Sequence, residues 1–237
     1  MKKLRLDKYL SDVLPYSRAE VKKIITKESV TVNGVIETDC GYKLDPSTDK
    51  ILCDGEETVY EPFRYYVLNK PAGCVTALSD DRFPTVMDYL KDINTKDLSP
   101  VGRLDKDTEG LLLITNDGKL SHDLLSPKKH VKKTYLALVD RILSAKEEEM
   151  IETGIDIGDD KPCLPAVIEH LPSLDKDGLF AYSLTITEGR YHQVKRMFEA
   201  VGSNVKKLTR TSFAALTLDD SLEKGSFKKI SLNDILG

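Results

Sequence analysis

The sequence predicts an α+β protein with two domains, a small N-terminal domain at residues 1–59 and a larger one at residues 60–237. Three observations support this prediction. Two short helical patterns and an Asn-Gly turn fit within the first sixty residues. A polar segment, residues 54–63, follows them and has the composition of a linker. Beyond it, strand and helix patterns interleave without a regular βαβ rhythm, which predicts a mixed, largely antiparallel sheet.

The small domain begins with two predicted helices. Residues 4–14 place leucine and valine side chains at roughly helical spacing. Ser17 can cap a second helix, and Glu20, three residues later, completes a capping box. The outer face of this helix carries four basic residues, Arg18, Lys22, Lys23 and Lys27. Residues 30–37 then alternate about an Asn-Gly turn, which predicts a β-hairpin.

The larger domain is expected to contain four strands and three helices. The predicted strands cover residues 65–70, 110–117, 132–139 and 179–187. The predicted helices cover residues 85–93, 144–154 and 192–202. The longest aliphatic run, residues 111–114, is far too short to span a bilayer. The N-terminus also lacks the uninterrupted apolar stretch of a signal peptide, so we expect a cytoplasmic protein without membrane contact.

Charge is distributed unevenly along the chain, although the formal net charge is only −4. Residues 1–27 contain eight Lys or Arg against three Asp or Glu, a local charge of +5. Residues 188–210 contain six against two, a local +4, and residues 140–160 contain two against eight, a local −6. Because patches matter more to a polyanion than the average charge does, the two basic segments indicate a nucleic-acid partner.

The cysteine and histidine patterns argue against a metal or redox centre. The four cysteines form no CxxC pair, and the four histidines do not cluster. Zinc sites and catalytic dithiols need such groupings. We therefore expect free thiols and no bound metal.

Three carboxylates stand close together in residues 101–118, where a loop meets a predicted buried strand. Asp105, Asp107 and Glu109 imitate the opening of a calcium loop, but the twelfth position is Asn116 where a Glu is needed. A glycosidase pair is disfavoured as well, because its two carboxyl groups must flank a scissile bond several ångströms apart. On these residues alone, a solvated turn that pairs with neighbouring basic side chains is the remaining alternative.

Four segments of the chain, in the family's order, resemble the motifs of the RsuA-type pseudouridine synthases. The strongest is GRLDKDTEGLLLITNDG at residues 102–118, which matches the family signature almost continuously. The other three are NKPAG (69–73), KTYLALV (133–139) and EGRYHQVKRMFEAVG (188–202). Residues 5–34, with RLDKYL, SRAEVKKII and VTVNG, resemble an S4 RNA-binding module. The resemblance implies an S4-like RNA-binding domain followed by a pseudouridine synthase catalytic domain.

The resemblance implies an isomerase that converts uridine in RNA to pseudouridine without a cofactor. Asp105 corresponds to the family's nucleophile. It could attack C1′, add to C6 or take the C2′ proton, and the sequence does not separate these routes. Lys195 or Arg196 is expected to pair with Asp105, and only one can face it, because consecutive helical residues point about 100° apart. Tyr135 is expected to stack on the base, and Arg103 to position the flipped nucleotide or its phosphate.

The resemblance also implies a set of RNA contacts and a target. The expected RNA-binding residues are Arg5, Lys8, Ser17, Arg18, Lys22, Lys23, Asn33, Lys132, Arg190, His192 and Gln193. YHQVKRMF at residues 191–198 is closer to the small-subunit enzyme than to large-subunit members, which implies uridine 516 of 16S ribosomal RNA, free or in an assembling subunit. The alternatives are a 23S-specific synthase and a non-catalytic S4-type RNA-binding protein. The intact Asp105 favours an enzyme, and we expect it to act as a monomer.

Overall fold

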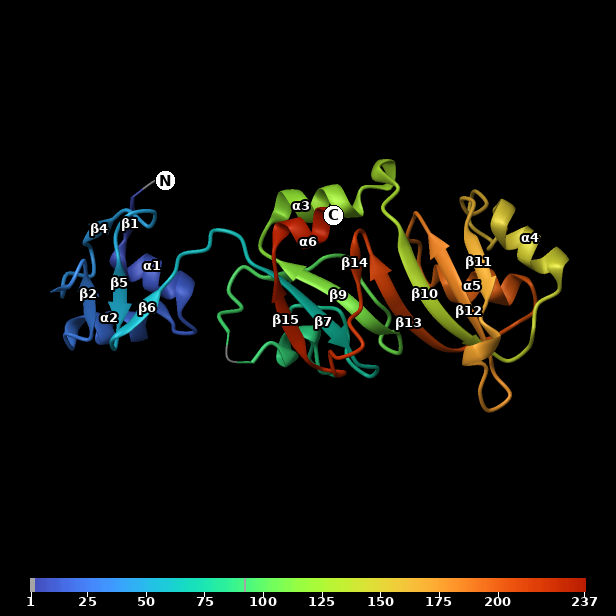
Figure 1. Ribbon diagram of the computed structural model, residues 1–237, viewed down its shortest axis with the longest axis horizontal. Coiled ribbons are helices and arrows are strands. Elements are labelled where there is room, and N and C mark those ends of the chain that lie inside the picture. Colours follow the sequence, from blue (N-terminus) through green and yellow to red (C-terminus); the bar gives the residue numbers. More distant parts are fainter. Residues whose placement is uncertain (1–2, 92) are drawn as a thin grey trace. The chain divides into compact units, whose positions relative to one another are not determined.

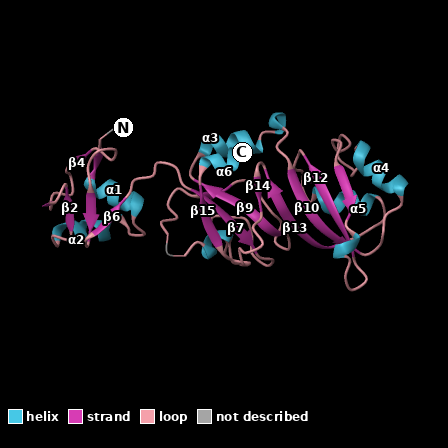
Figure 2. Ribbon diagram, in the orientation of Figure 1, coloured by secondary structure: helices cyan, strands magenta, loops and turns pink. Residues whose placement is uncertain are grey.

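The computed structural model describes residues 3–91 and 93–237, and the predicted α+β class is confirmed (Figure 1). The chain forms two compact units, and both contain helices and strands (Figure 2). The first unit comprises Met1–Phe63 together with Leu90–Leu98. The second comprises Arg64–Tyr89 together with Ser99–Gly237.

The first unit combines two helices with two small sheets. The helices are α1 (Leu6–Val13) and α2 (Arg18–Thr26). The four-stranded sheet runs in the order β3 (Val35–Ile36), β2 (Val30–Val32), β5 (Ile51–Cys53) and β6 (Glu56–Thr58). The second sheet pairs β1 (Leu4–Arg5) with β4 (Lys43–Leu44). Apolar side chains from the helices and the larger sheet form one buried core, which includes Leu10, Ile25 and Ile51.

Two local predictions in the first unit are confirmed. The Ser17 hydroxyl accepts a hydrogen bond from the Glu20 amide (3.3 Å), and the Glu20 carboxylate accepts one from the Ser17 amide (2.8 Å). This capping box begins α2 at the predicted place. Asn33 and Gly34 both have positive φ, 52° and 83°, as a two-residue hairpin between β2 and β3 requires.

The predicted linker at residues 54–63 is wrong in its first half. Asp54 and Gly55 have φ of 51° and 83° and form a second hairpin turn, so that β6 pairs with β5. Asp-Gly is a turn signal of the same kind as Asn-Gly. The strand is easily overlooked because β6 lies at the edge of the sheet and its glutamates are exposed.

The predicted helix at residues 85–93 is also wrong. Among the described residues of this segment only a single 3-10 turn forms, η1 (Val86–Tyr89), and Asp92 lies outside the described residues. The Val86 amide donates to the carbonyl oxygen of Val75 (3.0 Å), which ties the turn to a neighbouring loop. The chain then joins the first unit over Leu90–Leu98. Tertiary contacts therefore override the local helical pattern after one turn.

The described part of the second unit is built on a nine-stranded sheet. The order is β11–β12–β10–β13–β9–β7–β15, with β14 beside β13 and β8 beside β9. All of these pairs are antiparallel except β13 with β9. The strands are β7 (Tyr65–Lys70), β8 (Ser99–Pro100), β9 (Glu109–Thr115), β10 (Lys133–Val139), β11 (Val167–His170), β12 (Phe180–Ile186), β13 (Val205–Phe213), β14 (Leu216–Thr217) and β15 (Phe227–Ile230).

Helices cover parts of this sheet. They are α3 (Gly118–Leu125), α4 (Ala145–Thr153), α5 (Gln193–Ala200) and α6 (Leu232–Leu236), with 3-10 turns η2 (Pro127–Lys129) and η3 (Pro172–Leu174). The four predicted strands and two of the predicted helices, α4 and α5, are confirmed. The sequence does not predict β13, α3 or α6. Leu124 of α3 and Ile235 of α6 join a buried core with Leu111 and Leu113 of β9.

In the parallel pair of β9 and β13, Gly110 lies opposite Arg210. Gly110 has a φ of +100°. A Cβ atom there would overlap the carbonyl oxygen of Arg210 and lie 2.9 Å from its amide nitrogen. Only glycine fits both the backbone conformation and this close approach.

We expect Gly110→Ala to lower the free energy of unfolding by about 3 kcal/mol or more, since overpacking and a left-handed backbone each cost about 1–3 kcal/mol. Urea unfolding of the full chain measures this. The control is Gly118→Ala, because a Cβ at Gly118 would meet nothing within 4 Å. The control should shift stability by no more than about 0.5 kcal/mol. An unchanged urea midpoint for Gly110→Ala would contradict the argument.

Candidate active site

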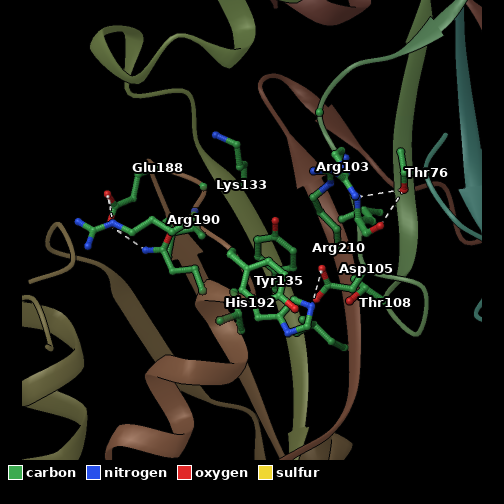
Figure 3. Close-up of a pocket in the computed structure, with 18 of the residues that line it drawn as sticks. Thr76, Arg103, Asp105, Thr108, Lys133, Tyr135, Glu188, Arg190, His192 and Arg210 are labelled. Atoms are coloured by element: carbon green, nitrogen blue, oxygen red, sulfur yellow. Dashed lines mark hydrogen bonds and ion pairs between the residues drawn. The ribbon is translucent and has the colours of Figure 1, made fainter. Parts of the chain in front are cut away.

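A cavity of about 680 Å³ lies in the second unit. It is bounded by the loop before β9, by strands β10 and β13, and by the segment that leads into α5. A volume of this size suits a small-molecule ligand or a single extruded nucleotide. Figure 3 shows side chains from distant parts of the chain converging there, and the wall includes Arg103, Asp105, Tyr135, His192, Lys195 and Arg210.

The loop that carries Asp105 is held by a buried lysine at the end of β7. The Lys70 side chain is fully buried, and its ammonium donates to the carbonyl oxygens of Pro71 (3.1 Å), Asp105 (3.0 Å), Lys106 (3.3 Å) and Thr108 (2.8 Å). Burial lowers the pKa of Lys70, although nearby carboxylates partly oppose this effect. The backbone of the loop thus supplies the hydrogen bonds that a buried ammonium needs.

Thr76 fixes the same loop through a second contact. Its hydroxyl donates to the carbonyl oxygen of Leu104 (2.7 Å) and accepts from the Leu104 amide (3.1 Å) (Figure 3). Asp105 therefore follows a residue whose backbone is held on both sides. Sequence reasoning missed Lys70 and Thr76 as site residues. The NKPAG motif was the available signal for Lys70, and no motif marks Thr76.

Asp105 faces two basic side chains. Lys195 Nζ lies 3.3 Å from Asp105 Oδ2, and His192 Nε2 lies 3.5 Å from Asp105 Oδ1. Lys195 also contacts Asp107 at 2.6 Å. Burial lowers the pKa of Lys195, but the hydrogen bond to Asp107 and the charge of Asp105 outweigh it, and the pKa is raised. Lys195 is thus a charged partner for Asp105 at neutral pH.

Arg196, the other candidate partner, points elsewhere. Its Nη2 lies 2.6 Å from Asp159 Oδ1 and donates to the carbonyl oxygen of Ile157, while Nη1 donates to that of Tyr191 (3.2 Å). These contacts tie the start of α5 to the loop before β11. Of the two neighbours, the fold brings only Lys195 to Asp105.

His192 has a left-handed backbone at the start of α5, with φ of 50° and ψ of 30°. Such a conformation is uncommon outside glycine and is often found at functional sites. The imidazole stacks on Tyr191, with ring centroids 3.9 Å apart and planes 15° apart. Tyr191 is 76% exposed and lines the cavity. The pair presents an open aromatic surface beside Asp105.

Tyr135 lies on β10, directly opposite Arg210 of β13. Opposite residues of an antiparallel pair project from the same face of the sheet. Both side chains accordingly line the cavity, and both are more than nine-tenths buried. Arg103 differs, since it is exposed and forms no hydrogen bond or ion pair with any described residue. Sequence reasoning missed Arg210 because β13 itself was not predicted.

Two predicted RNA contacts are occupied by internal bonds. Arg190 binds the Glu188 carboxylate (3.0 Å) and the carbonyl oxygens of Lys161 and Pro162. Gln193 is only 3% exposed, and its amide group bonds Glu188 (2.8 Å) and the Arg190 amide (3.0 Å). This geometry favours a structural role for both side chains, which hold the segment before α5 in place.

The predicted RNA-binding residues of the first unit fall into two groups. Arg5 pairs with Asp7 (3.0 Å) and Lys8 with Asp12 (2.6 Å). The Ser17 side chain caps α2, and the Asn33 side chain donates to the Asp49 carboxylate (3.0 Å) and accepts from the Lys50 amide (2.9 Å). Arg18, Lys22 and Lys23 are exposed and form no ion pair within the described part of the unit. In the second unit, Lys132 is likewise exposed.

The described residues contain neither a membrane-spanning helix nor a cluster of metal ligands. Within residues 3–91 and 93–237, every helix is too short or too polar to span a bilayer. In the same part of the chain, no group of three or more His, Cys, Asp or Glu side chains is arranged to hold a metal ion.

Known proteins of similar sequence include RNA pseudouridine synthases. Residues 64–200 match the RNA pseudouridylate synthase family, and residues 4–50 match the S4 domain. The chain is 40% identical to an uncharacterized RNA pseudouridine synthase of Bacillus subtilis (strain 168), covering 98% of this chain and 97% of that protein. It is 38% identical to ribosomal small subunit pseudouridine synthase A of Escherichia coli (strain K12), covering 98% of both.

A solved structure described as a pseudouridylate synthase is similar over the same extent. It shares 37% identity and a TM-score of 0.67, and the match covers 98% of both chains. The resemblance drawn from the sequence motifs is confirmed. The chain belongs to the RNA pseudouridylate synthase family and carries an S4 domain at its N-terminus.

Proposed function

We propose that this enzyme converts one uridine of 16S ribosomal RNA, uridine 516, to pseudouridine, with Asp105 as the nucleophile and no cofactor. The observation that carries the proposal is the Asp105 carboxylate, which lies 3.3 Å from the Lys195 ammonium on a loop held by Lys70. The 38% identity to small-subunit synthases over 98% of their length supports the choice of RNA. The enzyme acts as a monomer in the cytoplasm, on free RNA or on an assembling subunit.

The reaction needs a carboxylate and a rigid pocket. The N1–C1′ bond of uridine breaks, the base turns, and a C5–C1′ bond replaces it, so the overall change is an isomerisation. Asp105 attacks C1′, adds to C6 or removes the C2′ proton, and each route requires the ionised carboxylate. The ammonium of Lys195 stabilises that charge beside a polyanionic substrate.

The substrate enters the cavity as an extruded nucleotide. Extrusion from structured RNA costs a few kcal/mol and must be offset by contacts to the protein. Tyr135 stacks on the uracil, and the exposed guanidinium of Arg103 binds a phosphate of the flipped nucleotide. Tyr191 offers a stacking surface to a neighbouring base.

The S4 domain contributes affinity through phosphate contacts. Arg18, Lys22 and Lys23 lie on α2, are exposed, and form no ion pair with a carboxylate of the described first unit. Such cations release counterions when they bind RNA, so their contribution weakens as salt is added.

Asp105→Asn should bind small-subunit RNA normally and lower the single-turnover rate by at least about 10⁴-fold, as loss of a nucleophile does elsewhere. Carbodiimide labelling with reverse transcription detects the product as a new stop. Asp107→Asn is the matched control, because this neighbouring carboxylate is 71% exposed and should leave the rate within about tenfold. Full activity of Asp105→Asn would refute its role, and a stop in the large-subunit RNA would refute the choice of substrate.

Lys195→Gln and Arg196→Gln separate the two neighbouring cations of α5. Lys195→Gln should lower the single-turnover rate by about 10²-fold, because it removes the charge beside Asp105. Arg196→Gln should stay within about tenfold of the wild type, since its bonds go to the loop that contains Asp159. The reverse order of effects would show that Arg196 is the partner.

The triple variant Arg18→Gln, Lys22→Gln, Lys23→Gln should make the salt dependence of RNA binding shallower. Each phosphate contact contributes about 0.7–0.9 to the slope of log K against log salt, so the loss of three contacts should reduce the slope by about 2–3. Lys50→Gln is the control, because Lys50 is already paired with Glu57 at 3.1 Å. Equal slopes for the triple variant and the wild type would remove α2 from the RNA interface.

A further inference from the structure

Two buried polar atoms in the wall of the cavity lack a partner among the described residues. They are Nη2 of Arg210 and Oγ1 of Thr108. Each of these residues is only 2% exposed. A buried donor without an acceptor is unfavourable, and an unpaired hydrogen-bonding group on a guanidinium is more so. A ligand in the cavity would supply the missing acceptor.

Arg210 is held rigidly in the middle of the sheet. Its Nε donates to the carbonyl oxygen of Leu111 (2.8 Å), and its guanidinium carbon lies 4.9 Å from the centre of the Phe213 ring. It lies opposite Tyr135 and lines the same cavity as Asp105 (Figure 3). One side of the guanidinium is thereby fixed by the protein, while Nη2 stays unpaired.

No carboxylate of the described chain neutralises Arg210, which makes its surroundings positive. The other nearby cation is Lys133, whose ammonium lies 5.6 Å from the centre of the same Phe213 ring. Burial lowers the pKa of Lys133, and the charge of Arg210 lowers it further. Lys195, by contrast, is neutralised by Asp105 and Asp107. The cavity therefore has two kinds of cation. Lys195, beside Asp105, is paired with carboxylates, whereas Arg210, beside Tyr135, is not.

We propose that Arg210 is a further catalytic residue, whose Nη2 donates to a carbonyl oxygen of the target uracil and stabilises the negative charge that develops there. The inference rests on the proposed function, because it needs the target uridine in this cavity. Arg210 lines the cavity although it is only 2% exposed, so its partner is expected to be a base that enters the cavity fully, whereas a backbone phosphate is expected to stay beside the exposed Arg103.

Negative charge reaches the uracil oxygens in every route open to Asp105. When N1–C1′ breaks, its electron pair stays on the base and spreads from N1 to O2 and O4. C1′ then bonds an Asp105 oxygen, or the C2′ proton passes to Asp105 and leaves a glycal. When Asp105 instead adds to C6, the C5–C6 π pair moves onto O4 as an enolate. In the C6 route N1–C1′ breaks after the addition. In each case C5 finally bonds C1′, while Asp105 is released from C1′ or from C6 or returns its proton to C2′. C5 then loses its proton and N1 gains one.

The symmetry of uracil lets one fixed donor serve before and after rotation. A half-turn about the line through N3 and C6 exchanges N1 with C5 and O2 with O4. A guanidinium that holds one carbonyl position therefore meets an oxygen in both the substrate and the product orientation. A hydrogen-bond donor that is already in position need not reorient when the negative charge develops. Such donors are effective in catalysis because no free energy is spent on reorganisation.

The test combines an Arg210 variant with sulfur substitution at the target base. Full-length wild type and Arg210→Gln are compared on RNA that carries uridine, 2-thiouridine or 4-thiouridine, in single-turnover reactions. Arg210→Gln should slow uridine conversion by about 10²–10³-fold. At least one thio substitution should slow the wild type about tenfold more than it slows Arg210→Gln, because the contact it weakens is already lost.

Arg196→Gln is the control in the same set of rate comparisons. The factor by which it slows conversion should multiply with the factor by which each thio substitution slows conversion. If the rate loss of Arg210→Gln also multiplies with the rate loss of both thio substitutions, the inference is overturned and Arg210 is purely structural. That result would leave wild-type conversion of uridine, and hence the proposed function, intact. If Arg210→Gln unfolds at the assay temperature, Arg210→Lys replaces it. The rate losses of Arg210→Lys and of at least one thio substitution should then fail to multiply. If they multiply for both thio bases, the inference is refuted.

Discussion

The ammonium of Lys70 is the contact on which the geometry of the site depends. Four backbone carbonyl oxygens converge on it, and three of them belong to the loop that carries Asp105. A charge buried this deeply is tolerated only while its acceptors stay in place, so the loop and the lysine stabilise each other. The end of β7 thereby fixes the backbone of Asp105, the residue that we propose as the nucleophile, and a nucleophile acts well only when it is held in precise alignment.

The cations of the second unit differ in what they already bind, and this difference gives each a separate task. Lys195 is committed to Asp105 and Asp107, and Arg190 is committed to Glu188. Arg103 is exposed, whereas Arg210 is buried with part of its guanidinium unpaired. A whole-chain charge of −4 hides this arrangement. Recognition of a polyanion rests on the cations whose charge the protein itself leaves unbalanced.

Local rules predicted the parts of the fold that local interactions determine. The Ser17 cap, the Asn33 turn and the strand β9 follow from a few adjacent residues, and the family motifs pointed to Asp105 and Tyr135. The choice between Lys195 and Arg196 needed the orientation of α5. The position of Arg210 could be known only from the tertiary structure, because it follows from the pairing of β13 with β9. The failed helix at residues 85–93 has the same cause, since distant contacts decide its conformation.

The parallel pairing of β9 with β13 also bears on how the enzyme matures. Asp105 and its partner Lys195 are far apart in the chain, and the bond from Arg210 to Leu111 spans 99 positions. Contacts of such long range form late in folding, because loop closure must precede them. The first unit, which contains the S4 domain at residues 4–50, does not include β13. During synthesis, the unit that carries the S4 domain can therefore fold before the strand that completes the cavity has been made.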